Sequence, residues 1–400
     1  MAFRPSLGGV LAAVGLVAVA GVFVAPGGTI DDPDSADASS GDHRLNIAAY
    51  SAPKPGFEAL IHGFRETEQG ADTGFAESYG ASGDQSRKVS RHMPTDLVNF
   101  SVEPDLTRLV DSGQIRGDWK ENVPDDESER SVPFGSVVSF VTREGNPLGL
   151  ENWDDLLEPG VEVISPNPAS SGSAKWNLLA PYSSWFFQAL GGEAALGGAS
   201  VEDIEAAHDE ALSKVSTLVG EHFGIRPKSG REATSSFESG QGDVLLSYEN
   251  ETIELVRTGG VVDYSVPTDT FRIENPVALV DTSDDPDGDL GKATEFRDYL
   301  FSDEGEKLWA SAGFRPGPDL FNDSTEVIDT LPQEEKDAFR ETDTVYTIDQ
   351  IGEAFTTLYP EYEGKDAWDS WAIVDDVLFN RAEPGSGEDD GAITTIYKAV

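Results

Sequence analysis

The sequence predicts an α/β fold in which mainly parallel sheets carry helices on both faces. From Arg44 onward, short apolar runs that are typical of buried strands alternate with stretches of helical spacing. Such alternation favours parallel sheets with both faces covered. The chain has 400 residues, of which 38% are hydrophobic and 20 are Phe, so it can bury a large core and form more than one lobe.

The expected elements follow the chain in order. Strands are predicted at 45–50, 75–79, 96–100, 136–142, 161–164, 243–247, 261–266 and 276–280, and helices near 56–66, 106–110, 201–219, 293–301 and 305–312. Another helix should follow Trp176, and Pro181 should kink or restart it because proline lacks the N–H of the helix ladder. Helical spacing recurs at Trp368, Trp371, Val374 and Leu378.

These elements suggest a division of the chain. Residues 6–25 are nearly all apolar and follow Arg4, so 1–28 is expected to be a signal peptide or an N-terminal anchor. The expected order is then an acidic disordered linker at 29–43, a first lobe at 44–137, a second lobe at 138–266, a return to the first lobe at 267–345, and a C-terminal helical segment and tail at 346–400. The protein should therefore be exported and extracellular, either free or tethered at the cell surface.

The charge of the chain excludes some partners. The formal net charge is −46, from 74 Asp and Glu against 28 Lys and Arg. A basic patch for nucleic acid or anionic membrane is therefore not expected, and a halophilic source would explain the acidity, since concentrated salt screens self-repulsion. The chain has no Cys. This excludes disulfides, thiolate metal sites and a lipid-modified N-terminal cysteine.

Four junctions between a strand and the following helix carry small or hydroxyl side chains, at 50–51, 82–83, 170–173 and Tyr248. Ligands of open α/β sheets bind outside the carboxyl ends of the strands. At 170–173, Ser171 or Ser170 is expected to cap a helix whose unpaired N–H groups and dipole would favour an anion. Because two junctions fall in each lobe, a ligand is expected in the cleft between the lobes.

Several motifs resemble a known family. They are Gly145-Asn146-Pro147, the block at 152–156, the run Pro166-Asn167-Pro168-Ala169-Ser170-Ser171-Gly172, the block at 242–251, and 302–305 with 314–316. Together they resemble the periplasmic sulfate- and thiosulfate-binding proteins, the solute-binding components of sulfate ABC importers. The resemblance extends in register over roughly residues 45–320.

The resemblance implies a two-lobed type II periplasmic-binding-protein fold that closes on a dehydrated sulfate held by neutral donors. Carried over to this chain, the sulfate-binding residues are Ser51, Ser82, Ser171, Gly172, Ser173 and Tyr248. Arg231 is added to them from a region with a short deletion, where the family supplies another backbone N–H, and two interpretations of its side chain stay open: direct pairing with the anion and a surface ion pair. Ser51 stands where the family has aspartate, Ser173 where it has glycine, and Tyr248 where it has an indole donor. The implied partners are sulfate or thiosulfate and ABC permease subunits, and the chain should be a monomer.

Other functions remain open at this point. Molybdate or phosphate could replace sulfate as the bound oxyanion, and an exported hydrolase is a further alternative, although no nucleophile elbow is present. The five His are dispersed without ligand spacing, and the turn at 283–288 only loosely resembles a calcium loop because its twelfth position is Thr294. No catalytic residues, cofactor or metal site are therefore expected.

Overall fold

The computed structural model describes residues 43–400 except 121–130, 281–289, 318–320, 363–368 and 381–389. The described residues all belong to one compact unit that begins at Ser39. The leader expected at 1–28, nearly all of the linker expected at 29–43 and the calcium-like turn lie outside them. In the described part of the chain, no helix is both long and apolar enough to cross a membrane.

The first sheet is mainly parallel, as predicted. Its strand order is β10 (Val277–Leu279), β3 (Leu97–Asn99), β1 (His43–Tyr50) and β2 (Thr73–Gly80). β1 pairs in parallel with β2 and β3, and only β10 is antiparallel to its neighbour. The carboxyl ends of β1, β2 and β3 therefore lie at the same edge of the sheet.

Helices cover both faces of the first sheet because its strands are apolar on both faces. Leu45, Ile47 and Ala49 of β1 share one core cluster with α1 (Lys54–Arg65), α8 (Leu290–Leu300) and α9 (Asp303–Ser311). Ala48 points the other way and packs in a second cluster with α2 (Ser82–Val89) and α3 (Pro104–Asp111). This is the layered arrangement expected for buried parallel strands.

The larger sheet is mixed, so the prediction of a mainly parallel sheet in each lobe is wrong for this one. Its order is β12 (Thr344–Tyr346), β9 (Asp269–Glu274), β4 (Phe134–Arg143), β7 (Val244–Tyr248), β5 (Val163–Ile164) and β6 (Phe223–Ile225), and β8 (Val262–Ser265) and β11 (Arg315–Pro316) also pair with β4. Every pairing of β4 is antiparallel. The pairings of β5 with β6 and β7, and of β12 with β9, are parallel. The long crossing strand β4 thus makes this sheet mixed.

Sheet membership differs from the expected division at three strands. β9, β11 and β12 lie in the larger sheet, although the sequence assigned 267–345 to the first lobe. The return to the first sheet begins at β10. β9 stays in the larger sheet because Arg272, Ile273 and Glu274 pair with the start of β4. The limits of the lobes themselves stay predictions.

The helices of the second lobe also form two layers. α4 (Gly172–Leu190), α5 (Val201–Thr217), α12 (Ile348–Leu358), α13 (Ser370–Val374) and α14 (Ala392–Lys398) share one large core with Val138 and Phe140 of β4. α6 (Gly230–Glu238) and α7 (Glu249–Arg257) pack on the opposite face with Val141. The remaining elements are η1 (Trp153–Leu157), η2 (Glu193–Gly198), η3 (Leu218–His222), α10 (Asn322–Ile328), α11 (Gln333–Lys336), η4 (Pro360–Tyr362) and η5 (Asp375–Phe379).

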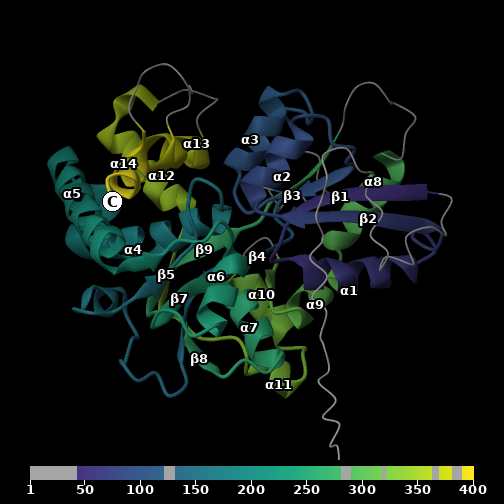
Figure 1. Cartoon of the computed structure of the whole chain (residues 1–400). Coiled ribbons are helices and arrows are strands. Elements are labelled where there is room, and N and C mark those ends of the chain that lie inside the picture. The colour runs from purple at the N-terminus through teal and green to yellow at the C-terminus, as the bar shows by residue number, and fades with distance from the viewer. Residues whose placement is uncertain (1–42, 121–130, 281–289, 318–320, 363–368, 381–389) are drawn as a thin grey trace, which may run out of the picture. The chain divides into compact units, whose positions relative to one another are not determined.

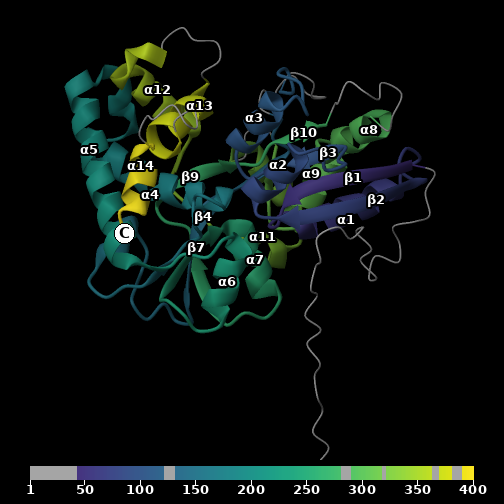
Figure 2. The same cartoon turned by 45° about the horizontal axis from the view of Figure 1, so that its top comes forward.

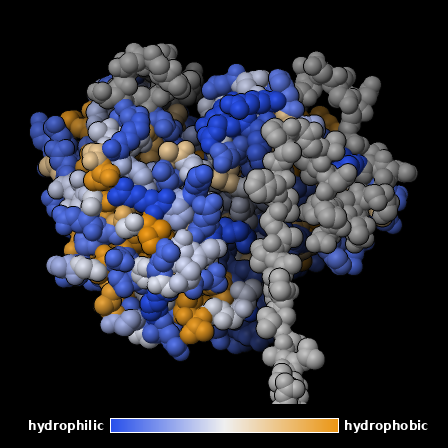
Figure 3. Space-filling view, in the orientation of Figure 1, coloured by the Kyte–Doolittle hydropathy of each residue, from blue (hydrophilic) through white to orange (hydrophobic). Residues whose placement is uncertain are grey.

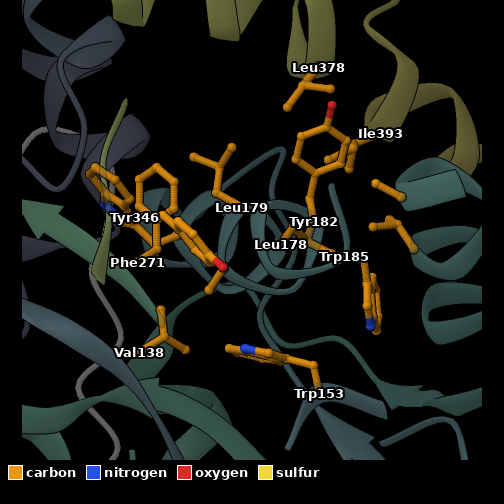
Figure 4. Packing of buried hydrophobic residues seen from close by; sticks show 14 of the residues in the cluster. Val138, Trp153, Leu178, Leu179, Tyr182, Trp185, Phe271, Tyr346, Leu378 and Ile393 are labelled. Atoms are coloured by element: carbon orange, nitrogen blue, oxygen red, sulfur yellow. The ribbon is translucent and has the colours of Figure 1, made fainter. Parts of the chain in front are cut away.

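Helix α4 lies at the centre of the second lobe. It is buried all round from Gly172 to Phe187, as expected of a helix that is apolar on every side. Val138 and Trp153 flank it on one side, and Leu378 and Ile393 flank it on the other (Figure 4). The helix runs unbroken through Pro181, so the restart that was one of the expected outcomes does not occur. The packing on all sides supports the helix where proline removes a hydrogen bond.

The C-terminal segment completes the core around α4. Its helices α12, α13 and α14 lie beside α4 and α5 in both views (Figures 1 and 2). The apolar spacing predicted at Trp371, Val374 and Leu378 is core packing, because all three are buried, whereas Trp368 lies outside the described residues. Lys175 of α4 also forms an ion pair with Asp375 of η5.

Lys120 ties the first lobe to this C-terminal segment. Its Nζ lies 2.6 Å from Asp369 Oδ2, at the start of α13, and also pairs with Glu103 at the start of α3. Burial and the negative charge of Asp369 outweigh the effect of Lys120 and raise the pKa of Glu103 to about 8. Burial would also raise the pKa of Asp369, but hydrogen bonds from Glu103 and Lys120 lower it to about 2. Glu103 is therefore protonated at neutral pH.

This raised pKa predicts a pH dependence of stability. Between the ordinary pKa of a glutamate, about 4.3, and about 8, the folded protein holds a proton that the unfolded chain has lost. Stability should therefore fall as pH rises through this window, by at most about 1.4 kcal/mol per unit. Melting temperatures at pH 6 and pH 8.5 should show the loss in the wild type and a smaller loss in Glu103→Gln. Glu205→Gln, on the exposed face of α5, is the control and should lose as much stability as the wild type between these pH values. If Glu103→Gln lost as much stability as the wild type, Glu103 would not be the group responsible.

The surface is dominated by hydrophilic residues. Figure 3 shows them spread over the visible face, with apolar residues gathered in small separate patches. Like charges at this density repel one another, and the Debye length falls from about 10 Å at 0.1 M salt to about 3 Å at 1 M. The net charge of −46 therefore opposes folding most strongly in dilute buffer.

We predict that the melting temperature rises by several degrees between 0.2 M and 2 M KCl. Screening of carboxylate repulsion is the physical reason, so Glu205→Gln with Glu210→Gln, both on exposed positions of α5, should weaken the salt dependence. Thermal melts of the wild type and of this double variant, at the same KCl concentrations, measure the salt dependence of the melting temperature. A melting temperature indifferent to KCl would count against a halophilic adaptation.

Candidate anion-binding site

One small cavity gathers six of the seven residues that the sequence singles out. It is lined by Tyr50, Ser51, Ala52, Gly80, Ala81, Ser82, Ser101, Ser171, Gly172, Ser173, Ser229, Gly230, Arg231 and Glu251. Counted as the space open to the centre of a water-sized sphere, its volume is about 20 Å³. A single water needs roughly 10–15 Å³ on this measure, so the cavity suits a small inorganic group and not a large organic ligand.

The lining comes from the carboxyl ends of strands in both sheets. Ser51 follows β1, Ala81 follows β2, and Ser101 lies two residues after β3. From the larger sheet, residues after β5 and β6 supply the starts of α4 and α6, and Glu251 comes from the first turn of α7, which follows β7. This is the arrangement predicted from the rule that ligands bind at the carboxyl ends of strands.

The start of α4 presents unpaired N–H groups to the cavity. Ser171 is the residue before the helix, as expected, but its Oγ shares a hydrogen bond of 2.7 Å with Ser173 Oγ. The first internal donor is Ala174 N–H, which reaches Ser171 O at 3.2 Å. The N–H groups of Gly172 and Ser173 lie before it and, with the helix dipole, favour an anion.

Gly172 is held tightly against the first lobe. A Cβ at this position would stand 2.6 Å from Ser101 Oγ and 2.7 Å from Ser101 Cβ, which leaves no room for a side chain. Trp176, one turn later in α4, donates its indole N–H to Ser101 O at 2.7 Å. The two lobes therefore meet at the cavity, and only glycine permits this approach.

The start of α2 faces the cavity from the first lobe. Ser82 Oγ donates to Asp105 Oδ2 at 2.6 Å and accepts from Ser101 N–H at 3.0 Å. The hydroxyl of Ser82 is therefore already engaged, and its backbone N–H is the donor suited to an anion. The helix ladder begins with Asp84 N–H, which donates to Ala81 O at 2.9 Å, so the N–H groups of Ser82 and Gly83 precede it.

The start of α6 supplies a third set of donors. Ser229 caps this helix by accepting from Glu232 N–H at 3.3 Å, which places the N–H groups of Gly230 and Arg231 ahead of the ladder. A Cβ at Gly230 would stand 3.3 Å from Ser173 Oγ, so the starts of α6 and α4 adjoin. The Arg231 side chain is exposed, and its charge acts on Glu251 across the cavity wall.

Tyr248 is the one predicted residue that does not line the cavity. It is fully buried, and its Oη shares a hydrogen bond of 2.8 Å with Ser101 Oγ. Tyr50, and not Tyr248, lines the cavity. The Tyr50 ring contacts the Tyr248 ring edge-on, with 6.3 Å between the ring centroids. Among the residues that the structure describes, Tyr50 Oη is buried without a hydrogen-bond partner. Burial raises the pKa of both tyrosines, so both hydroxyls keep their protons.

Glu251 brings a carboxylate to the same cavity. It is half-buried, and Ser247 Oγ donates to its Oε2 at 3.4 Å. Burial raises its pKa, and the charge of Arg231 and the bond from Ser247 oppose that shift. A carboxylate repels an anion, so the charge of Glu251 limits which anions the cavity can bind.

The sequence interpretation missed Tyr50, Ser101 and Glu251 as site residues. Ser101 could have been found with the rule used for the others, because it follows the predicted strand 96–100. Tyr50 belonged to a predicted junction, but Ser51 was selected there. Glu251 was part of the motif at 242–251, and no sequence signal showed that it lines the cavity.

The four histidines whose side chains the structure describes lie in the core or at the surface. Tyr182 Oη and His208 Nδ1 share a bond of 2.6 Å, and His222 Nδ1 lies 3.0 Å from Val161 O. Burial lowers the pKa of His208 to about 4. Within the described ranges, no cluster of three or more His, Asp or Glu side chains is arranged to hold a metal ion.

Comparison with known proteins finds relatives over most of the chain. Residues 45–315 match the family described as bacterial extracellular solute-binding protein. A sulfate-binding protein of Synechococcus elongatus is 31% identical over 327 residues, which are 81% of this chain and 85% of that protein. A thiosulfate-binding protein of Pseudomonas aeruginosa is 32% identical over 274 residues, 67% of this chain and 74% of that protein.

A solved structure agrees with these relatives. The sulfate-binding protein SubI from Mycobacterium tuberculosis superposes with a TM-score of 0.65 and 43% sequence identity, and the match covers 80% of this chain and 99% of that one. The family match spans more than half of the chain, and the two-lobed fold and the cavity at its strand ends agree with it. The chain is therefore a member of the bacterial extracellular solute-binding proteins, in the branch whose relatives are named sulfate- and thiosulfate-binding proteins.

Proposed function

We propose that this protein captures sulfate or thiosulfate outside the cell and delivers it to an ABC import permease. The observation that carries the proposal is the convergence of three helix starts, those of α2, α4 and α6, on one small cavity between the lobes. Each start offers backbone N–H groups and the positive end of a helix dipole. The relatives named for sulfate and thiosulfate support the same ligand class.

The donors of the cavity suffice for useful affinity. The proposed ligands of the anion are the backbone N–H groups of Gly172, Ser173, Ser82 and Gly230 and the hydroxyls of Tyr50 and Ser171. A hydrogen bond to a charged group contributes roughly 1.5–3 kcal/mol. Four or five such bonds reach the about −8 kcal/mol of a micromolar complex. In this proposal Ser51 and Arg231 border the anion, and Tyr248 acts by holding Ser101.

The proposal needs no chemical step on the ligand. The N–H groups of the cavity stabilise a bound charge and leave the bonds of the anion intact, which suits a carrier that must release what it binds. The apolar stretch at 6–25 would direct export, with cleavage or retention as a tether, and the folded unit would act as a monomer.

Hydrogenphosphate is a second candidate ligand because of Glu251. Sulfate has no proton at neutral pH, so a cavity made only of donors suits it. Phosphate carries a proton that needs an acceptor, and the Glu251 carboxylate, which lines the cavity, could accept it.

A competition titration tests the proposed function. Calorimetry in 2 M KCl with sulfate, thiosulfate, molybdate and phosphate should give micromolar or tighter binding of sulfate or thiosulfate, because the donors match their fully ionised oxygens. Tighter binding of phosphate than of sulfate or thiosulfate would favour hydrogenphosphate, the second candidate ligand. Absence of binding by all four anions to the folded protein would contradict the proposal.

Removing a hydroxyl from the cavity should weaken sulfate binding. Tyr50→Phe loses a donor to a charged group and should raise Kd about tenfold or more, and Ser171→Ala should raise it several-fold. Tyr79→Phe and Ser170→Ala are matched controls, because Tyr79 Oη donates to Glu77 and Ser170 Oγ donates to Lys228 O at 2.9 Å. Wild-type affinity in Tyr50→Phe would remove that hydroxyl from the site.

A further inference from the structure

The carboxyl group of Glu251 lies directly beside the donors of the cavity. A Cβ at Gly230 would stand 3.2 Å from Glu251 Oε2 and 3.3 Å from Ser173 Oγ. The carboxyl oxygen and the Ser173 hydroxyl therefore approach the same point at the start of α6. A dianion that accepts from the N–H groups of α4 and α6 would meet this carboxyl group at short range.

The surroundings of Glu251 do not neutralise it by a close ion pair. Among the described residues, its hydrogen bond is the one that Ser247 Oγ of β7 donates, at a long 3.4 Å. Arg231 of α6 acts on it by charge alone, and that side chain is exposed to solvent. Tyr50 of β1 and Tyr248 of β7 face it with neutral hydroxyls, and the pKa of each is raised further by the charge of Glu251.

Further carboxylates adjoin Glu251 on its other side. A second cavity of about 190 Å³ shares Ala52, Arg231 and Glu251 with the first and is also lined by Glu238 and Glu254. Burial disfavours the charged form of Glu251 and raises its pKa, and the charge of Arg231 and the hydrogen bond from Ser247 oppose that shift. A sulfate dianion in the first cavity would add two more negative charges on the opposite side.

We propose that binding of sulfate takes up one proton, and that this proton resides on the Glu251 carboxyl group and is donated in a hydrogen bond to the anion. The inference rests on the proposed function and adds that one proton binds together with the anion. Protonation turns a repelling carboxylate into a donor, so one group decides whether a fully ionised oxyanion is accepted. A hydrogenphosphate ion would satisfy the same site by bringing its own proton to ionised Glu251.

The proton makes affinity depend on pH in a defined direction. Below the pKa of Glu251 in the free protein, the carboxyl is already neutral and affinity is constant. Above it, each bound sulfate must take a proton from solvent, so Kd for sulfate should rise by up to about tenfold per pH unit. Sulfate itself does not take up or lose a proton near neutral pH. Any pH dependence of its Kd must therefore come from the protein.

Calorimetry of the folded, exported chain tests the proton directly. Titration with sulfate in 2 M KCl, in two buffers of different ionisation enthalpy at several pH values from 6 to 8.5, should show proton uptake that rises toward one per anion, and Kd should rise with pH over the range where protons are taken up. Glu251→Gln keeps an N–H donor without a titrating group, so it should take up no proton and lose the pH dependence. Glu254→Gln, in the adjoining cavity, should behave as the wild type.

The outcomes separate the two proposals. Sulfate binding by the wild type without proton uptake would overturn the role of Glu251 and leave the proposed function standing. Proton uptake that persists in Glu251→Gln would also overturn it, because the proton would then belong to another group. Failure of the folded wild type to bind any of the tested oxyanions would instead contradict the proposed function. The wild-type measurement needs no variant, so the test holds even if Glu251→Gln folds poorly.

Discussion

The close approach of Gly172 to Ser101 is the contact on which the cavity depends. It brings the start of α4 against the loop that follows β3, at a distance that no side chain could tolerate. Trp176 and Tyr248 both bond to Ser101 from the second lobe, so this residue holds the junction from both sides. The helix starts can converge on a small cavity only because the backbone of Gly172 lies against the Ser101 side chain here.

The rest of the second lobe keeps α4 in place. The helix is surrounded by the larger sheet, by α5 and by the C-terminal helices, and Lys175 fastens it to η5. A helix buried on all sides cannot easily rotate or slide, since interiors are packed as densely as organic crystals. The positive end of its dipole therefore keeps its direction. In the proposed function, this fixed dipole is what offsets the net charge of −46 at the cavity and favours an anion there.

Much of the fold was predictable because buried strands and amphipathic helices leave local patterns. β1, β2, β7 and α9 lie within one or two residues of the predicted limits. The exceptions depend on distant neighbours. α4 continues through Pro181 because other elements enclose it, and β9 and β12 join the larger sheet because of their pairing with β4 and with each other. Strand partners and the support around a proline are absent from local sequence.

The sequence alone determined the location of the cavity, because Ser51, Ser82 and the run 171–173 follow strands whose carboxyl ends must meet. Tertiary structure decided which side chains line the cavity and which are engaged elsewhere. It turned the Tyr248 hydroxyl toward Ser101, engaged the Ser82 hydroxyl with Asp105, and left the Tyr50 hydroxyl and the Glu251 carboxyl in the cavity wall. The physical reason is that a strand end fixes a residue's position, whereas the direction of its side chain is set by contacts from the other sheet.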